Sequence, residues 1–440
     1  MTMKWALYNM LFAVAYCVMM PSFLLRMKRR GGYRARMGDR FASYPDDIRD
    51  RLKPDASAGA PIWLHAVSVG EVQVAGQLMQ ALRAVDPSIR FVFSTTSSTG
   101  WRTAEGLLAD GDILIYNPLD FPRLVRKALD AVSPRAVILT ETEIWPNFIR
   151  EIRRRRIPLF LANARISDRS APRYRAMRWF FGDVFRCFTK MYVQSDLDAE
   201  RLAAAGADPS AMDVTGSFKF DVAKRNPQKE AELRAWVGDG RVLLGGSTWP
   251  GEDEVLLRIY RETPPDVKLV IAPRHFEKAD AVEDNIRRAG FMCVRRSRGD
   301  SCTHPDATGK ADSASQMRPV YLADTTGELM GLFGIASAAF VGKSLCAHGS
   351  QNMIEPCLCG VPTVVGPYTE NFRPVMSDLL AADAIVQVKD EAEMRSALLS
   401  FLDVGGKVKA DALGERARAA VVRRRGATER CAKDIMSYLG

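Results

Sequence analysis

The sequence predicts an α/β protein with two doubly wound domains, each built on a parallel sheet that helices cover on both faces. Short, continuous apolar runs alternate with amphipathic segments of helical period from residue 62 onward, and such runs are typical of strands buried on both faces. Polar residues gather directly after these runs, where a doubly wound sheet builds its ligand site. At 440 residues the chain is long enough for two domains of ordinary size.

Composition narrows the possible functions. The chain is 47% hydrophobic and 26% charged, which is typical of a folded globular protein. A net charge of +10 indicates an anionic partner without specifying its kind. The 8 cysteines form no CxxC pair and the 4 histidines are few for a metalloenzyme, so we predict no metal site. Cys357 and Cys359 are interpreted as buried helix packing, with metal binding as the alternative.

The N-terminal region has the pattern of a membrane anchor. Trp5 to Leu25 contains no charged residue, and a segment of this length can cross the hydrocarbon core of a bilayer. Lys and Arg residues cluster between positions 26 and 40, and such a flank keeps the following domain on the cytoplasmic side and attracts anionic headgroups. The absence of an A-x-A cleavage site argues against a signal peptide. We therefore predict an anchor with its basic flank at residues 1–30; Asn9 and Pro21 leave open a helix that lies in the interface.

The first domain is predicted for residues 31–222 and is organised around IWLHAVSVGEVQ at 62–73. Ile62–Leu64 forms a strand, a loop of small residues follows, and a helix begins near Glu71. Because ligands lie beyond the carboxyl ends of strands in such domains, Glu71 is expected to face a cleft; the alternative is a carboxylate favoured only by the helix dipole. Further strands are expected at Phe91–Phe93, Ile113–Tyr116, Ala136–Leu139, Pro158–Ala162 and Lys190–Gln194.

The second domain is predicted for residues 241–440, final helices included, after a linker at 223–240. No G-x-G-x-x-G follows a strand, which disfavours a dinucleotide-dependent dehydrogenase. Two doubly wound domains joined by a short linker, with their polar loops facing a cleft, form the GT-B architecture of glycosyltransferases. Strands are expected at Arg241–Leu244, Val267–Ile271, Pro319–Ala323, Ala338–Val341 and Thr363–Val365.

Residues 150–190 are rich in Lys and Arg, poor in Asp and Glu, and interleaved with aromatic residues. Such a run is typical of a solvated helix face. Beside a membrane anchor it equally suits an enzyme that grips an anionic lipid. Both interpretations stay open.

Eight segments, in this order, resemble the Kdo transferases, which attach 3-deoxy-D-manno-octulosonic acid (Kdo) to the lipid A precursor. The resemblance covers nearly the whole chain, and the order of the segments makes it specific. The segments are HAVSVGE (65–71), ETEIWPN (141–147), NARISDRS (163–170), QSDLDAERL (194–202), GSFKFD (216–221), APRH (272–275), DTTGEL (324–329) and QNMIEP (351–356).

The resemblance implies roles for individual residues. Glu71 is the expected general base, and Glu141 and Lys219 are expected to stabilise the transition state. Gln351, Trp249 and Lys343 depart from the residues common in the family, which puts donor contacts in doubt more than the reaction. Donor-binding loops are expected at Pro273, Arg274, Thr326, Gly327, Glu328, Asn352, Met353, Ile354 and Glu355, with Ser247, Thr248 and Ser344 as further candidates.

The implied reaction explains these residue types. The donor CMP-Kdo is a co-substrate that carries its own leaving group, so neither a metal nor a cofactor is expected. A carboxylate such as Glu71 takes the proton of the attacking hydroxyl, and a single displacement inverts the anomeric centre. Arg274 and backbone donors near Asn352 can meet the charge on the phosphate, and Glu355 can accept hydrogen bonds from ribose hydroxyls.

Structural roles remain open for three of the expected site residues. The alternatives are a surface ion pair for Lys219, helix packing for Glu355 and a structural hydrogen bond for Glu141. His65 and His275 are interpreted as residues that orient loops, because a histidine at a strand end more often has this role than a catalytic one.

The resemblance also implies binding partners and a cellular location. They are CMP-Kdo, an anionic lipid A precursor (lipid IVA) and inner membrane lipids, with no nucleic acid. The expected location is the cytoplasmic side of the bacterial inner membrane, in lipopolysaccharide core biosynthesis. A transferase for another nucleotide sugar, a sugar-nucleotide epimerase and a non-catalytic membrane-tethered binding protein remain as alternatives, and the number of Kdo units is open.

Overall fold

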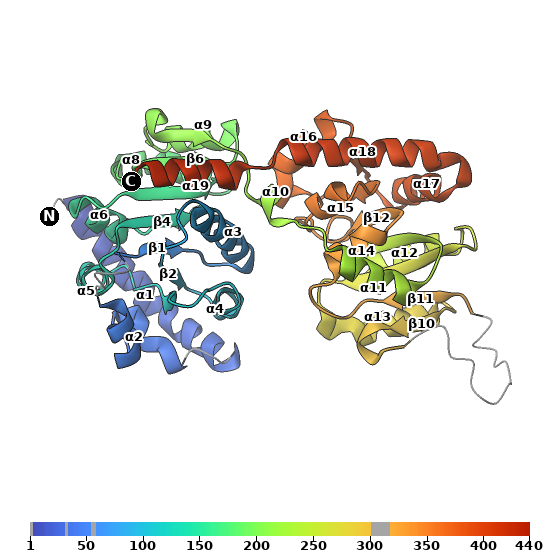
Figure 1. The fold of residues 1–440 in the computed structure, drawn as a ribbon, viewed down its shortest axis with the longest axis horizontal. Coiled ribbons are helices and arrows are strands. Elements are labelled where there is room, and N and C mark those ends of the chain that lie inside the picture. The colour runs from blue at the N-terminus through green and yellow to red at the C-terminus, as the bar shows by residue number, and fades with distance from the viewer. Residues whose placement is uncertain (1–2, 31–33, 54–58, 301–316) are drawn as a thin grey trace. The chain divides into compact units, whose positions relative to one another are not determined.

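The computed structural model describes residues 3–30, 34–53, 59–300 and 317–440, except for the side chains of 21–35. The chain forms two compact units (Figure 1). The first consists of Met1–Val222 together with Gly426–Gly440, and the second of Ala223–Arg425. Each unit is a helix-covered parallel sheet, so the predicted fold class is confirmed.

The first unit is built on a 7-stranded sheet in the order β3-β2-β1-β4-β5-β6-β7. β1 pairs in parallel with β2 on one side and β4 on the other, so the order reverses between β1 and β4. Such a switch point is where doubly wound domains bind ligands. The strands are β1 (Ile62–His65), β2 (Phe91–Thr95), β3 (Ile113–Tyr116), β4 (Ala136–Thr140), β5 (Leu159–Ala164), β6 (Lys190–Val193) and β7 (Met212–Val214).

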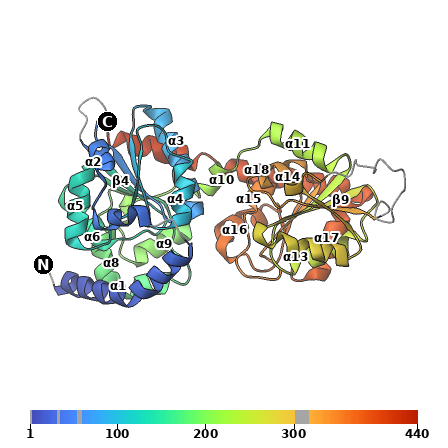
Figure 2. The ribbon, with the colours of Figure 1, turned by 90° about the horizontal axis from the view of Figure 1, so that it is seen from below.

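Helices cover both faces of this sheet because neighbouring strand residues point to opposite sides. Leu64 packs with residues of α3, α4 and α19, whereas Trp63 packs with residues of α1, α2, α5, α6, α8 and α9. Figure 2 shows these two layers. The helices are α1 (Met3–Arg30), α2 (Asp46–Leu52), α3 (Val69–Val85), α4 (Ser98–Glu105), α5 (Pro122–Val132), α6 (Pro146–Arg154), α7 (Ala171–Ala176), α8 (Arg178–Phe185), α9 (Asp196–Ala204), α10 (Lys219–Val222) and α19 (Ala427–Ser437).

The final helix α19 belongs to the first unit, which corrects the expectation that the second domain runs to residue 440. Cys431 and Ile435 are fully buried in the core that includes α3. Asp221 accepts hydrogen bonds from the backbone N–H of Gly426 (2.7 Å) and of Thr428 (2.9 Å). The chain therefore returns to the first sheet after completing the second.

The second unit has a 7-stranded sheet in the order β10-β11-β9-β8-β12-β13-β14, and its switch point lies between β8 and β12. The strands are β8 (Arg241–Thr248), β9 (Val267–Pro273), β10 (Met292–Arg295), β11 (Pro319–Leu322), β12 (Ala338–Val341), β13 (Thr363–Val365) and β14 (Val386–Gln387). The helices are α11 (Pro227–Val237), α12 (Glu252–Tyr260), α13 (Ala279–Arg288), α14 (Leu329–Ile335), α15 (Ile354–Leu358), α16 (Arg373–Ala381), α17 (Glu391–Leu402) and α18 (Lys407–Arg423).

Most of the expected linker at 223–240 is instead part of the second unit. Leu233 and Val237 of α11 are buried in one of its cores, together with Leu332 of α14. α11 begins after Asn226, whose side chain accepts a hydrogen bond from Lys229 N at 3.1 Å. An N-cap and a buried apolar face make this segment a core helix.

The N-terminal helix α1 contains one stretch, Met3–Met20, that is long and apolar enough to cross a membrane, with a mean hydropathy of 1.3. Length and composition alone support this statement, and core helices and signal sequences share these properties.

Candidate active site

Glu71 lies at the switch point of the first unit, in the first turn of α3. Ser68 is the N-cap of this helix and accepts a hydrogen bond from Glu71 N (3.3 Å). The Glu71 carboxylate in turn accepts from Val67 N (3.1 Å) and from the Ser68 hydroxyl (2.7 Å). These reciprocal contacts, which resemble a capping box with its second bond shifted to the residue before the N-cap, hold a half-buried carboxylate in one orientation at the end of β1.

The loop that carries Glu71 is closely packed on one side and open on the other. Ser97 Oγ donates to the carbonyl of Val67 (2.6 Å), and a Cβ at Gly100 would lie 2.5 Å from that same oxygen. A Cβ at Gly70, in contrast, would meet no heavy atom within 4 Å. Space is therefore open directly beside Glu71.

Glu141 follows β4 across the switch point and is only 6% exposed. Its backbone has a positive φ of 51°, an uncommon conformation for a non-glycine residue that is enriched at functional sites. Nε of Arg165 donates to Oε2 of Glu141 at 2.7 Å. Nearby, Oε2 of Glu143 accepts from Trp145 Nε1 (3.1 Å) and lies 3.6 Å from Nε2 of the buried His65.

Lys219 is positioned by the end of β5. Asn163 has a φ of 55° and is fully buried, and its side-chain oxygen accepts from Phe218 N at 3.0 Å. Gln194 Nε2 donates to the Asn163 carbonyl at 2.9 Å. These contacts fix the start of α10, of which Lys219 is the first residue.

The expected catalytic residues interact electrostatically. Burial raises the pKa of Glu71; the Ser68 hydrogen bond opposes this effect, and the charges of Glu141 and Glu143 add to it. Burial lowers the pKa of Lys219, and the charge of Glu141 opposes it. The structure thus brings Glu71, Glu141 and Lys219 into one cluster. Arg165 and Glu143, although they lie within the motifs NARISDRS and ETEIWPN, were not predicted as members.

At the switch point of the second unit, the fully buried Glu252 joins two loops. Its Oε2 accepts from Trp249 N (2.8 Å) after β8 and from Lys343 N (2.8 Å) after β12. Its Oε1 accepts from the next three backbone N–H groups, those of Ser344, Leu345 and Cys346, at 3.1, 3.1 and 3.4 Å. Sequence reasoning missed Glu252, because an acidic residue in a first helical turn is common.

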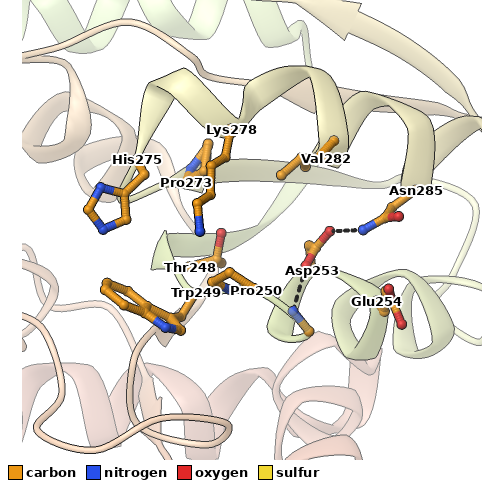
Figure 3. A pocket seen from close by; sticks show the side chains of 12 residues that line it. Thr248, Trp249, Pro250, Asp253, Glu254, Pro273, His275, Lys278, Val282 and Asn285 are labelled. Atoms are coloured by element: carbon orange, nitrogen blue, oxygen red, sulfur yellow. Dashed lines mark hydrogen bonds between the residues drawn. The ribbon is translucent and has the colours of Figure 1, made fainter.

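A cavity of about 140 Å³ opens between the ends of β8 and β9 (Figure 3). The Trp249 ring lies 4.9 Å from the ring of His275, and Lys343 Nζ lies 5.0 Å from the Trp249 centroid. Thr248 and Pro273 are the predicted donor residues that line it, and Figure 3 shows Trp249 and His275 together at one end. The cavity is smaller than typical small-molecule pockets of about 300–1,000 Å³.

A second group of predicted donor residues gathers at α15. Asn352 Nδ2 donates to Glu355 Oε1 at 3.0 Å, and Asn352 Oδ1 accepts from Ile354 N at 3.1 Å. Burial raises the pKa of Glu355, while the Asn352 hydrogen bond and the charge of Arg274 lower it. Arg274, which is exposed, donates its backbone N–H to Thr248 O at 3.0 Å. Arg274, Asn352 and Glu355 therefore lie close to one another.

Other predicted donor residues have structural contacts. The side chains of Met353 and Ile354 are fully buried, which leaves only their backbone for a ligand. The Ser344 hydroxyl donates to Val341 O (2.6 Å) and accepts from Gly366 N (2.8 Å).

Glu328 is 8% exposed and forms ion pairs with Lys229 and Arg296, each at 3.1 Å. Burial pushes its pKa upward, but hydrogen bonds led by that of Arg296 keep the pKa of Glu328 below its usual value. Thr326 and Gly327 are exposed, and Ser247 is 8% exposed with a φ of 53°.

Metal ligation has no obvious site in the part of the chain that the structure describes. There, no group of three or more His, Cys, Asp or Glu side chains could hold a metal ion. The expectation that the reaction needs no metal stays a prediction.

Known proteins share this fold and sequence. The structure of HepE from Anabaena in complex with UDP has a TM-score of 0.58, covers 86% of this chain and all 100% of its own, and is 13% identical, which shows the common fold. Two parallel-sheet units, each with a switch point in its strand order, give this chain the GT-B fold. Residues 35–222 match the family model described as 3-Deoxy-D-manno-octulosonic-acid transferase (kdotransferase).

Full-length relatives extend this match. The 3-deoxy-D-manno-octulosonic acid transferase of Haemophilus influenzae is 30% identical over 92% of both chains. The enzyme of the same name from Bordetella pertussis is 33% identical over 89% of this chain and 90% of its own. The chain belongs to the Kdo transferase family.

Proposed function

We propose that the protein transfers Kdo from CMP-Kdo to a sugar hydroxyl of lipid IVA, the lipid A precursor, in lipopolysaccharide core biosynthesis. The reaction takes place at the cytoplasmic surface of the bacterial inner membrane. The names of the relatives support the donor sugar, and the apolar helix α1 supports a membrane location. The observation that carries the mechanism is the oriented Glu71 carboxylate beside the open space at Gly70.

Glu71 acts as the general base. The acceptor hydroxyl approaches through the space beside Gly70, and Glu71 takes its proton while the oxygen bonds to the anomeric carbon of Kdo. The bond from that carbon to the CMP phosphate breaks, CMP leaves with the electron pair, and the anomeric centre inverts. A base works best with a pKa near the working pH, and burial and neighbouring carboxylates raise the pKa of Glu71.

The neighbouring charges stabilise the transition state. The Glu141 carboxylate, held by Arg165, faces the positive charge of the oxocarbenium-like sugar. Lys219 balances the negative charge that grows on the leaving phosphate. Because these charged groups are already oriented before the reaction, little free energy is spent on reorienting them in the transition state.

The second unit binds the CMP half of the donor. Arg274 provides positive charge for the phosphate, and the buried Glu355, oriented by Asn352, accepts hydrogen bonds from ribose hydroxyls. Met353 and Ile354 contribute backbone groups only. No metal takes part.

Transfer of Kdo to lipid IVA in detergent, with CMP-Kdo made in situ and EDTA present, tests the proposal. Products are read by mass, which also counts the Kdo units. Wild type is compared with Glu71→Gln, and with Glu200→Gln on the exposed side of α9 as the matched control. Transfer by wild type and the control, with a loss of about 100-fold or more in Glu71→Gln, supports the proposal.

Two results would contradict parts of it. Full activity of Glu71→Gln would move the base elsewhere. If calorimetry shows that the wild-type protein binds UDP rather than CMP, the donor assignment is overturned.

A further inference from the structure

The N-terminal helix α1 is docked on the first unit along one of its faces. Trp5 is 6% exposed, and its ring lies 5.3 Å from Phe180 of α8. Farther along, the rings of Phe12 and Tyr16 lie 5.2 and 5.8 Å from Phe121. Figure 2 shows α1 running beside the helix layer that contains α8.

Polar contacts make this docking specific. The Tyr8 hydroxyl donates to Oδ2 of Asp120 at 2.8 Å, and Asn147 Nδ2 donates to Oδ1 of Asn9 at 2.8 Å. Asp120 is 1% exposed and also accepts from the backbone N–H groups of Asn147 (2.9 Å) and Phe148 (2.8 Å). Tyr8 thus donates the third of these hydrogen bonds to the Asp120 carboxylate, which also accepts from the backbone N–H groups in the first turn of α6. Withdrawal of α1 from the first unit would uncover this carboxylate and the rings of the docking face.

The opposite face of α1 is apolar and exposed. Residues 3, 7, 10, 11, 14 and 18 repeat at helical spacing and form one stripe. We call this stripe the outer stripe. It consists of Met3 (89% exposed), Leu7 (42%), Met10 (57%), Leu11 (56%), Val14 (57%) and Val18 (73%), with Met19 (59%) beside it.

Basic and aromatic groups surround the docked helix. The Arg150 guanidinium lies 4.5 Å from the centroid of the Trp5 ring. Trp179 of α8 is 55% exposed next to Phe180, which contacts α1, and Met177 is 43% exposed. Arg173 and Arg175 on α7 are exposed as well. An apolar stripe flanked by Arg and Trp matches the interface of a bilayer with anionic headgroups.

We propose that α1 lies parallel to the membrane plane, docked on the first unit, and inserts the outer stripe into the interfacial layer of an anionic leaflet instead of spanning the bilayer. A spanning helix would have to give up the contacts of Trp5, Tyr8 and Asn9, since a folded domain cannot follow it into hydrocarbon. The docked helix keeps every one of these contacts and still buries the outer stripe. The inference deepens the proposed function, on which it rests only for the identity of the membrane.

Depth measurements along α1 test this orientation. Nitroxide labels are placed at Met3→Cys, Met10→Cys and Val18→Cys in the full chain, with accessible native cysteines such as Cys17 changed to Ser. The protein is bound to phosphatidylethanolamine–phosphatidylglycerol vesicles, and label depth is read from oxygen and nickel collision rates. We expect the same shallow depth at all three positions. A spanning helix would separate residues 3 and 18 by about 22 Å in depth, and that gradient would overturn the proposal.

A second experiment tests the outer stripe itself. Leu11→Asp/Val18→Asp is expected to weaken vesicle binding by about tenfold or more, because each carboxylate must leave water. The matched control, Val408→Asp on the second unit, changes a valine that is 80% exposed and should bind vesicles like wild type. Unchanged vesicle binding of the double variant would contradict the proposal.

The experiments distinguish a failure of the proposed Kdo transfer from a failure of the proposed orientation of α1. Kdo transfer in detergent does not need the membrane, so the double variant should keep wild-type activity there. A wild-type protein inactive in detergent, with equal label depths in vesicles, would overturn the proposed function and leave the helix orientation standing. An active protein with a depth gradient would do the reverse.

Discussion

Arg165 holds Glu141 through a hydrogen bond of 2.7 Å from its Nε to Oε2 of the carboxylate. The contact links the loop after β4 to the loop after β5, on one side of the switch point. It also brings a cation close to Lys219, since the Arg165 charge lowers the pKa of that amine. Arg165 therefore orients Glu141, and its charge adds to burial, the larger cause, in lowering the pKa of Lys219.

Replacing Arg165 tests this dependence. Arg165→Gln is expected to lower kcat for Kdo transfer about 10- to 100-fold, because Glu141 loses the group that orients it. The melting temperature should hardly change, since the Arg165 side chain is 39% exposed. Arg169→Gln, which removes an exposed arginine from the same loop, is the control for charge alone. Equal losses in both variants would contradict a specific role.

The pH profile should report the carboxylate cluster. The reactive form of Glu71 is the carboxylate, so activity is lost as the pH falls through its pKa, which burial raises above the ordinary 4.5. The negative charge of Glu143 raises that pKa further. Glu143→Gln should therefore shift the acidic limb of kcat/KM to lower pH, while Glu200→Gln leaves it unchanged. A shift to higher pH would refute this electrostatic coupling.

Two glycines near Glu71 should respond in opposite ways. Gly70 lies in α3 with open space at its Cβ, so Gly70→Ala should raise the free energy of unfolding by about 0.5–1 kcal/mol. The same methyl group occupies the proposed approach of the acceptor, so transfer should fall. Gly100→Ala puts a Cβ 2.5 Å from Val67 O and should lower stability by about 1–3 kcal/mol. Thermal melts and transfer assays separate the two outcomes.

Glu252 should be essential for the loops of the second unit. Glu252→Gln replaces one acceptor oxygen by an amide NH₂ that faces backbone N–H groups, so we expect a loss of about 2–4 kcal/mol in stability and weaker CMP binding. Glu262→Gln, which removes an exposed carboxylate after α12, should cost less than about 1 kcal/mol. Denaturant unfolding and calorimetry with CMP make the comparison. Unchanged CMP affinity in a folded Glu252→Gln protein would argue against the loops as the donor site.

Every central strand was predictable from the chain, whereas only one of the four edge strands, β3, was. The expected strands from Ile62–Leu64 to Thr363–Val365 are all present, because strands buried on both faces require continuous apolar runs. The three strands that were not expected, β7, β10 and β14, all lie at sheet edges. An edge strand such as Val386–Gln387 needs only a few paired residues and leaves a weak pattern in the sequence.

The position of Glu71 followed from local pattern alone. A buried strand and a loop of small residues predicted a helix start near Glu71, and both signals act over a few residues; the Ser68 cap was seen only in the structure. The family motifs likewise identified Glu141 and Lys219 without any knowledge of distance. Such features are encoded within short segments of chain.

Contacts between residues that are distant in the sequence could be identified only in the folded structure. Arg165 meets Glu141, Glu252 joins two loops, Tyr8 meets Asp120 and α19 returns to the first sheet, each through contacts between distant positions. The chain shows which residues are apolar, capped or charged, because those properties belong to single residues and their near neighbours. Which charge faces which, and which side of α1 is left for a membrane, follows only when packing brings separated segments within hydrogen-bonding distance.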